Sequence, residues 1–570
     1  MDAALLTQRL RNQAIALAPK VKASDKSNAT TFGSQVAGSG TFWVNGVAQG
    51  GCDCTPPSST PQPVPYPLQS MIFASLEIMF NYISAINCGP TRASRFLYLW
   101  MFTVTSAYRW TQRTSDLSGV IDNWNWTTRR STTPFPTSTS ISSWMTQVLA
   151  YTMPILAPPT TAAQILQLER NLQLWTPLDQ ATQSGYVRTL GHFTVWQAAW
   201  SAWYALRQTD GFVAAQAPPT FAQLPNGGIL MDPAICQDIT TYPNPYQWTP
   251  LVLNSIPKQY YTRTWETVRS VVLTAANDTS VKATAAPYFP GYNTTQRTAE
   301  INDVVAKTAT LGIPGVASDT NKVTAEFWAG GPNTVTPPGM FMWLWRQYAL
   351  AFRVAQYQGY DTLLYSGLDL AVHLFEAGRL AWGIKLQYQE ARPIQEIRRL
   401  YPTTDLSGWE TYVDVSGVLQ TAPDISGCLW VPYQEQNFVT PPFPDFISGH
   451  SCYSEVFALV MGDWYGPTIP TSDPVVAYDL PLYSPMFSGS QSQPFGVFQI
   501  ASGSSRIQPG LVPATPITLS FATWQDIATS AGISRQWGGI HAESAHTGGQ
   551  AAAVAIHTFV SAALNLPPAP

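Results

Sequence analysis

Three short segments in the C-terminal half of the chain place cationic, hydroxyl and imidazole side chains at spacings that could bind an oxyanion. In the first segment, Lys385 and Arg392 are seven residues apart, which is two helical turns, and a proline directly follows Arg392. Apolar residues step by three, four or seven through residues 360–391, so we expect a helix with both cations on its buried face and an end near the proline. A lone Lys/Arg pair more often reaches solvent or pairs with a nearby carboxylate, here Glu390 or Glu396. Alone, this segment is a weak indication of a site.

The second segment, residues 441–450, reads PPFPDFISGH and precedes the apolar-periodic residues 451–464. We expect a rigid, proline-rich approach to a helix N-terminus, where unpaired N–H groups and the helix dipole favour an anion. Ser448 could donate its hydroxyl and Gly449 its N–H to that anion. The alternative is a simple serine N-cap beside an exposed His450.

The third segment, residues 534–541, carries Arg535 and His541 on either side of two glycines. The glycines allow the chain to fold back, so both side chains could face one ligand at the start of a last helix, residues 542–564. A single histidine at a helix start is more often a capping or exposed residue. Taken together, however, the three segments supply three cations, two helix N-termini, a hydroxyl and a neutral imidazole, which suit tightly held phosphate or vanadate without a zinc or magnesium cage.

The three segments resemble the signature of the vanadium-dependent haloperoxidases and of their relatives, the acid phosphatases and type 2 phosphatidic acid phosphatases. That signature reads K-x6-RP, then PSGH, then SR-x5-H. The order and internal spacing are the same here, and the one departure within the motifs is Ile447 in place of proline. The matching residues are Lys385, Arg392 with Pro393, Ser448, Gly449, His450, Ser534, Arg535 and His541.

The surrounding residues are similar to the chloroperoxidase type. Trp382 and Phe443 match the aromatic pair that lines the halide pocket in those enzymes, and residues 326–329 (EFWA) followed by 336–338 (TPP) resemble another family stretch. The resemblance is concentrated in residues 325–560.

The resemblance implies a vanadate-dependent haloperoxidase that oxidises halide with hydrogen peroxide to hypohalous acid through a peroxovanadate. His541 would be the metal ligand, and His450 would be the acid/base group for peroxide. Lys385 would act in catalysis as well as in binding. The implied vanadate-binding set is Lys385, Arg392, Ser448, Gly449, Arg535 and His541.

Two carboxylates that usually support this site are missing. Gly330 and Gly331 occupy the positions of a carboxylate that orients the last arginine, and Ala545 stands where an aspartate often follows the vanadate-bearing histidine. Glu326 or Glu543 could substitute, and without such partners we expect weak chlorination.

Two other functions stay open. The same site could be an acid phosphatase with His541 as nucleophile and His450 as acid to the leaving alcohol. The chain could also be a non-catalytic scaffold that retains the fold.

The elements that must position these residues are predominantly helical. We expect an all-α fold of two helical bundles with long Pro/Gly-rich loops and the site in the C-terminal bundle, its mouth framed by residues 401–444. The expected domains are an N-terminal extension (1–67), an N-terminal bundle (68–255) and a C-terminal bundle carrying the oxyanion site (256–570). Helices are expected at residues 71–86, 95–108, 141–151, 163–174, 187–206, 259–276, 296–310, 322–330, 338–357, 359–391, 451–464, 521–531 and 541–564.

The charge and hydropathy of the sequence argue against nucleic-acid and membrane partners. The formal net charge is −4 and only 11% of residues are charged, so the sequence lacks the basic footprint of a nucleic-acid-binding protein. No apolar run has the length of a membrane span, and no signal peptide is visible. The six cysteines are too sparse for a disulfide scaffold, although Cys52 or Cys54 could bridge to a distant partner. An organic acceptor, a homo-oligomer and the compartment stay open, with an extracellular location slightly favoured.

Overall fold

The computed structural model describes residues 42–44, 47–49, 68–112, 139–158, 180–470, 475–479, 490–564 and 566. Helices dominate these residues, and the strands form only two-stranded antiparallel sheets. The all-α prediction is therefore confirmed. The strands are β1 (Phe42–Val44), β2 (Val47–Gln49), β3 (Val252–Leu253), β4 (Ile256–Pro257), β5 (Asp405–Leu406), β6 (Thr411–Val413), β7 (Leu419–Thr421), β8 (Ile425–Ser426), β9 (Val475–Asp479), β10 (Ser490–Pro494), β11 (Val497–Ile500) and β12 (Ile517–Ser520).

Two compact units make up the chain. The first comprises residues 1–86, 99–119 and 123–204, and the second comprises residues 87–98, 120–122 and 205–570. Residues 205–255, which we assigned to the N-terminal bundle, lie in the second unit. The expected limits of the folding domains stay predictions, and the expected helix at 163–174 and Cys52 and Cys54 lie outside the described residues.

The N-terminal part of the described chain contains α2 (Leu68–Ala85), α3 (Pro90–Gln112), α4 (Thr139–Leu156) and α6 (Gln180–Gln208). Large aromatic side chains fill the core of the first unit. The rings of Trp144 and Trp196 meet edge to face with centroids 5.8 Å apart. Trp200 donates its indole N–H to the Thr103 hydroxyl at 2.9 Å, so this buried polar group is satisfied.

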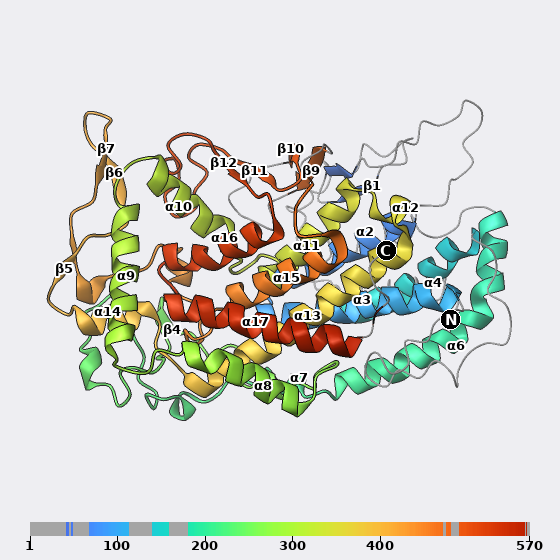
Figure 1. Ribbon diagram of the computed structural model, residues 1–570, viewed down its shortest axis with the longest axis horizontal. Coiled ribbons are helices and arrows are strands. Elements are labelled where there is room, and N and C mark those ends of the chain that lie inside the picture. Colours follow the sequence, from blue (N-terminus) through green and yellow to red (C-terminus); the bar gives the residue numbers. More distant parts are fainter. Residues whose placement is uncertain are drawn as a thin grey trace, which may run out of the picture. The chain divides into compact units, whose positions relative to one another are not determined.

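Four helices of the second unit lie alongside one another (Figure 1): α13 (Gly359–Tyr388), α15 (Gly449–Tyr465), α16 (Trp524–Trp537) and α17 (Glu543–Leu564). Helix α15 packs against the other three. Helix α13 is buried around its whole circumference from Thr362 to Lys385, which is typical of a central core helix. The remaining helices of this unit are α7 (Phe212–Ala215), α8 (Ala275–Ala285), α9 (Thr295–Leu311), α10 (Val316–Phe327), α11 (Thr336–Ala351), α12 (Val354–Tyr357) and α14 (Pro393–Leu400).

One expected helix is wrong and another is interrupted. Residues 259–276 form turns and a short 3₁₀ segment at Trp265–Thr267, and α8 begins only at Ala275. β-Branched Thr and Val residues are frequent in this stretch and lower its helix propensity. The expected helix 338–357 divides between α11 and α12 because Arg353 adopts a left-handed conformation with φ of 49°.

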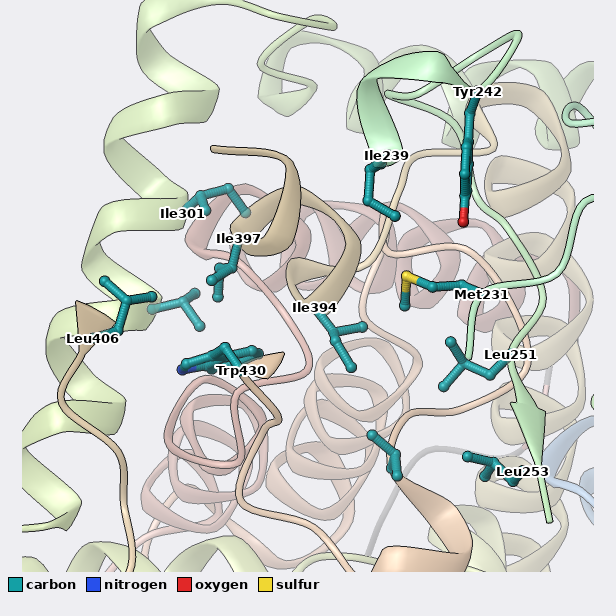
Figure 2. Packing of buried hydrophobic residues seen from close by; sticks show 12 residues of the cluster. Met231, Ile239, Tyr242, Leu251, Leu253, Ile301, Ile394, Ile397, Leu406 and Trp430 are labelled. Carbon is teal, nitrogen blue, oxygen red and sulfur yellow. The ribbon is translucent and has the colours of Figure 1, made fainter. Parts of the chain in front are cut away.

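An apolar cluster anchors the short helix α14 (Figure 2). Ile394 and Ile397 of α14 are fully buried there, together with Ile301 of α9 and Trp430 of the following loop. A disulfide between Cys236 and Cys428 ties the two loop regions that border the cluster. The start of α14 is thereby held in place, which matters because Arg392 lies there. Within the described residues, no helix combines the length and apolar character needed to cross a bilayer.

Candidate oxyanion site

Lys385 lies in the last turn of α13 and is fully buried. Its Nζ donates to the carbonyl oxygens of Pro444 at 2.7 Å and Asp445 at 2.9 Å. An ammonium group has three N–H donors, so one remains for a ligand. Burial, followed by the charge of Arg392, holds the pKa of Lys385 well below its usual value.

Arg392 is not on the same helix as Lys385, and our expectation of a shared helical face is wrong. Helix α13 ends at Tyr388, and Arg392 is the extended N-cap residue of α14 with φ of −69° and ψ of 154°. Proline at the next position disfavours the α conformation for Arg392 and is itself favourable at the first position of the new helix. Chain reversal, rather than helical periodicity, brings the two cations together.

The guanidinium of Arg392 is buried and oriented by main-chain oxygens. Its Nε donates to Phe443 O and its Nη1 to Ile540 O, both at 2.7 Å. Its Nη2 is buried and has no hydrogen-bond partner among the described residues. Because a buried unpaired donor is costly, an oxyanion at this position would satisfy a group that the protein leaves unpaired.

The two predicted halide-pocket residues lie against the cations. The rings of Trp382 and Phe443 are tilted with centroids 4.7 Å apart. Lys385 Nζ is 5.2 Å from the Phe443 ring centroid, and the Arg392 guanidinium carbon is 5.0 Å from it. The Trp382 indole N–H is occupied, since it donates to Tyr261 O at 2.9 Å. The pair therefore presents mainly apolar ring surface beside positive charge.

The second motif forms the N-terminus of α15, as expected. Ser448 is the N-cap residue, and its Oγ accepts from Ser451 N at 3.3 Å. Its own N–H donates to Ala545 O of α17 at 2.7 Å, which fixes the cap against the last helix. A Cβ at Gly449 would lie 3.4 Å from the Trp382 ring, so the helix start packs closely on the aromatic pair.

His450 points its imidazole toward the chain after α10. Its Nε2 lies 2.8 Å from Trp328 O, and because a carbonyl can only accept, Nε2 carries the hydrogen and Nδ1 keeps a lone pair. Burial, then the charges of Arg535 and His541, holds the pKa of His450 well below its usual value. The group is thus a neutral base, and it is half-buried.

Arg535 belongs to the last turn of α16, whereas we expected that helix to end at residue 531 and Arg535 to lie in the turn after it. The helix runs past the predicted end to Trp537, and the chain turns at Gly539 with φ of 69°. Arg535 donates from Nε to Ser534 Oγ at 2.9 Å and from Nη2 to Ala325 O. Burial lowers the pKa of Arg535 to about 9.

His541 lies in the turn between α16 and α17 and contacts both a cation and a carboxylate. Its Nε2 is 3.2 Å from Arg392 Nη1, and its Nδ1 is 2.5 Å from Asp445 Oδ1. Burial, followed by Arg392, lowers the pKa of His541 to about 3, despite the opposing effect of Asp445. The imidazole is neutral at ordinary pH.

The structure places Lys385, Arg392 and His541 around the segment that leads into α15, and His450 is electrostatically coupled to Arg535 and His541. The two glutamates that we considered as partners of Lys385 and Arg392 pair with other arginines. Glu390 pairs with Arg297 and Glu396 with Arg399.

The suggested substitutes for the missing carboxylates are wrong. Glu326 accepts from Tyr433 and Ser505, each at 2.5 Å, and Glu543 accepts from Gln536 at 2.7 Å. None of the hydrogen bonds that these two carboxylates make goes to Arg535 or His541. The carboxylate that contacts His541 is Asp445, which the sequence analysis missed. Its position inside the second motif, three residues before Ser448, was the available signal.

Comparisons with known proteins identify the fold that carries these residues. Residues 365–565 match the family model described as the VCPO second helical-bundle domain. A crystal structure of a bacterial vanadium-dependent iodoperoxidase aligns over 87% of this chain and 96% of its own, with a TM-score of 0.53 and 17% identity. The chain has the fold of the vanadium haloperoxidases.

Two further vanadium haloperoxidase structures support the same conclusion. The holo form of a bacterial vanadium-dependent chloroperoxidase covers 84% of this chain and 93% of its own, with a TM-score of 0.50 and 15% identity. The apo form of a bacterial vanadium-dependent chloroperoxidase covers 85% and 98%, with a TM-score of 0.52 and 16% identity. A search of curated proteins found no match. The resemblance inferred from the motifs is confirmed, and every predicted site residue lies inside the matched range 365–565.

Proposed function

We propose that this chain is a vanadate-dependent haloperoxidase that uses hydrogen peroxide to oxidise halide to hypohalous acid. The observation that carries the proposal is the buried meeting of Lys385, Arg392 and His541, with Arg392 Nη2 unpaired. Asp445 offsets part of the positive charge of Lys385 and Arg392, but it does not pair with Arg392 Nη2. A buried donor without a partner is unfavourable, and an oxyanion would satisfy it.

The donor set fits vanadate. Arg392 Nη2 and the third N–H of Lys385 remain for its oxygens, and the N-terminus of α15 adds the dipole and the Gly449 N–H. We assign Arg535 and the Ser448 hydroxyl to the same binding set, with His541 Nε2 as the metal ligand. When bound, vanadate supplies a Lewis-acidic centre that activates peroxide without a change of oxidation state.

The protein's own groups then handle protons and halide. His450, neutral and with a lone pair at Nδ1, accepts the proton of arriving peroxide. Lys385 withdraws electron density from the reacting oxygen through its remaining N–H. Trp382 and Phe443 provide an apolar edge that partly strips water from the halide.

A surface pocket beside α10 and the loop 401–444 offers an approach to this side of the bundle. The loop 401–444 contributes Tyr433 and Phe438 to its lining, and Ala325 and Ala329 come from the chain at and after α10. Ala325 O holds Arg535, so the pocket borders the second layer of the site. This arrangement supports the expectation that loop 401–444 frames the entrance, and an organic acceptor could enter there.

The test is to incubate the phosphate-free protein with orthovanadate, hydrogen peroxide and iodide or bromide, and to follow triiodide or tribromide formation. We expect oxidation only with vanadate present and its loss in His541→Ala. The matched control is His557→Ala, which removes a histidine of α17 that pairs with Asp463, and it should leave the rate unchanged.

The same preparation, without vanadate, should be assayed with a phosphate monoester. Ester hydrolysis that depends on His541, with no vanadate-dependent halide oxidation, would replace the proposal with the acid phosphatase. Neither activity, together with no measurable binding of orthophosphate or vanadate, would leave a scaffold that retains the fold.

A further inference from the structure

A buried carboxylate lies directly behind His541 and is fixed by four contacts. Asp445 is fully buried; its Oδ1 is 2.5 Å from His541 Nδ1, and its Oδ2 accepts from Arg297 Nη2 at 3.0 Å. Its backbone N–H donates to Glu390 O at 3.0 Å, and its carbonyl accepts from Lys385. Such a side chain has no freedom to leave the imidazole.

The hydrogen bond with Asp445 specifies one tautomer of His541. An ionised carboxylate can only accept, so the hydrogen shared with Asp445 belongs to Nδ1. Arg392 Nη1 lies 3.2 Å from Nε2 and 3.5 Å from Nδ1, so it contacts the ring without lying along the lone pair of either nitrogen. With its one hydrogen on Nδ1, the neutral imidazole keeps a lone pair on Nε2 for the oxyanion. The opposite tautomer would set the Nδ1 lone pair against the carboxylate of Asp445.

The surroundings of Asp445 favour its ionised form. Burial alone would raise its pKa, but the hydrogen bond from His541 and the charges of Arg297 and Arg392 bring the pKa below its usual value. Arg297 is itself buried and also lies 3.4 Å from Glu390 Oε1. A cation thus supports the carboxylate from the side opposite the histidine.

We propose that Asp445 is the positioning residue that fixes His541 with its unprotonated Nε2 toward the oxyanion. The proposal rests on the proposed function for the identity of that oxyanion. It also explains how the chain manages without an aspartate at 545: the small, buried Ala545 contributes only its carbonyl to Ser448, and the carboxylate comes instead from the motif that leads into α15. Carboxylates that orient metal-binding histidines typically contribute 10- to 100-fold to affinity or activity.

The first test reads the tautomer in the unliganded wild-type protein. The chain has six histidines, so long-range ¹H–¹⁵N spectra of histidine-labelled protein are simple, and His541→Gln identifies the signal of His541. We expect hydrogen on Nδ1 and a lone pair on Nε2. A proton on Nε2 would overturn the proposal, and this measurement does not depend on the folding of any Asp445 variant.

The second test compares Asp445→Ala, Asp445→Asn and Asp369→Asn. Asp369 is the matched control because it also lies beside a buried histidine, His373, and accepts from Trp464, but it is 16 residues before Lys385 on α13. Orthophosphate and orthovanadate affinities are measured by titration calorimetry. We expect a 10- to 100-fold loss in Asp445→Ala.

The conservative variant separates geometry from charge. The asparagine amide oxygen can still accept from Nδ1–H, so Asp445→Asn should keep the tautomer and recover part of the affinity, and Asp369→Asn should bind as wild type. Unchanged tautomer and affinity in Asp445→Ala would overturn the proposal.

Failure of the proposed function has a different signature. Phosphate binding that depends on Asp445, without vanadate-dependent halide oxidation, would refute the haloperoxidase and leave the role of Asp445 intact. Halide oxidation that persists in Asp445→Ala, with the same rate and the same vanadate affinity, would support the haloperoxidase and refute the role of Asp445.

Discussion

Gly549 of α17 lies against the N-terminus of the site helix, where a single added methyl group should disturb the site. A Cβ at this position would be 2.8 Å from Ser448 O and 3.0 Å from Ser451 Cβ. Carbon contacts are optimal at about 3.5–4.0 Å, so α15 must move by roughly 0.5–1 Å to admit it. The carbonyl oxygen of Ser448 belongs to the backbone and cannot rotate away. Gly549→Ala is therefore a probe of how tightly the cap of α15 is fixed.

Gly462 provides the matched control on α15 itself, since a Cβ there meets nothing within 4 Å. Replacing glycine by alanine within a helix gains about 1 kcal/mol, and Gly462→Ala should show this gain. Gly549→Ala gains the same amount but incurs overpacking of about 1–3 kcal/mol. Its net change is a loss of about 0–2 kcal/mol, which leaves it about 1–3 kcal/mol less stable than the control.

Urea unfolding followed by circular dichroism measures the stability difference, and calorimetry measures orthophosphate affinity. A displacement of Ser448 and the Gly449 N–H should weaken phosphate binding about tenfold, or about 1.4 kcal/mol, in Gly549→Ala alone. If Gly549→Ala is as stable as Gly462→Ala and binds phosphate like wild type, the close packing of α17 on this cap does not position the site.

Three further predictions concern other parts of the second unit. Arg392→Lys should weaken orthophosphate binding about 10- to 100-fold, because a charge-assisted hydrogen bond contributes about 1.5–3 kcal/mol and lysine cannot reproduce the forked donor; calorimetry showing wild-type affinity would contradict this. Burial lowers the pKa of Lys322, which donates to Gln508, to about 8. Between pH 8 and 10.5 this lysine is therefore protonated in the unfolded chain and neutral in the folded one. The free energy of unfolding of the wild type, relative to Lys322→Met, should rise with pH by up to about 1.4 kcal/mol per pH unit. Urea midpoints of the two proteins that change with pH in the same way would refute this prediction. Cys236→Ser should lower the free energy of unfolding by about 2–4 kcal/mol because the bond to Cys428 closes a loop with a sequence separation of 192, and an unchanged midpoint in urea would argue against it.

Local sequence signals predicted much of the site. A serine before an apolar-periodic run indicates a helix N-cap, and Ser448 takes that position in the structure. Two glycines indicate a chain reversal, and Gly539 supplies it. These features depend on residues that are close in sequence, so they can be predicted before the fold is known.

Features that depend on distant packing were not predictable in the same way. The helical spacing of Lys385 and Arg392 was misleading, because Pro393 starts a new helix instead of merely ending the old one. The partners of His541 were missed because Asp445 is 96 residues away in sequence. The Cys236–Cys428 bond stayed open for the same reason, since cysteine spacing alone does not define pairing.

The proline-rich entry to α15 has one more consequence, for the thermodynamics of anion capture. Prolines lack N–H groups but keep their carbonyls, and this segment offers three main-chain oxygens, from Phe443, Pro444 and Asp445, to the two cations. Long basic side chains otherwise lose up to about 2 kcal/mol of rotamer freedom when a ligand immobilises them. Here that loss is incurred during folding, so an incoming anion meets donors that are already aligned.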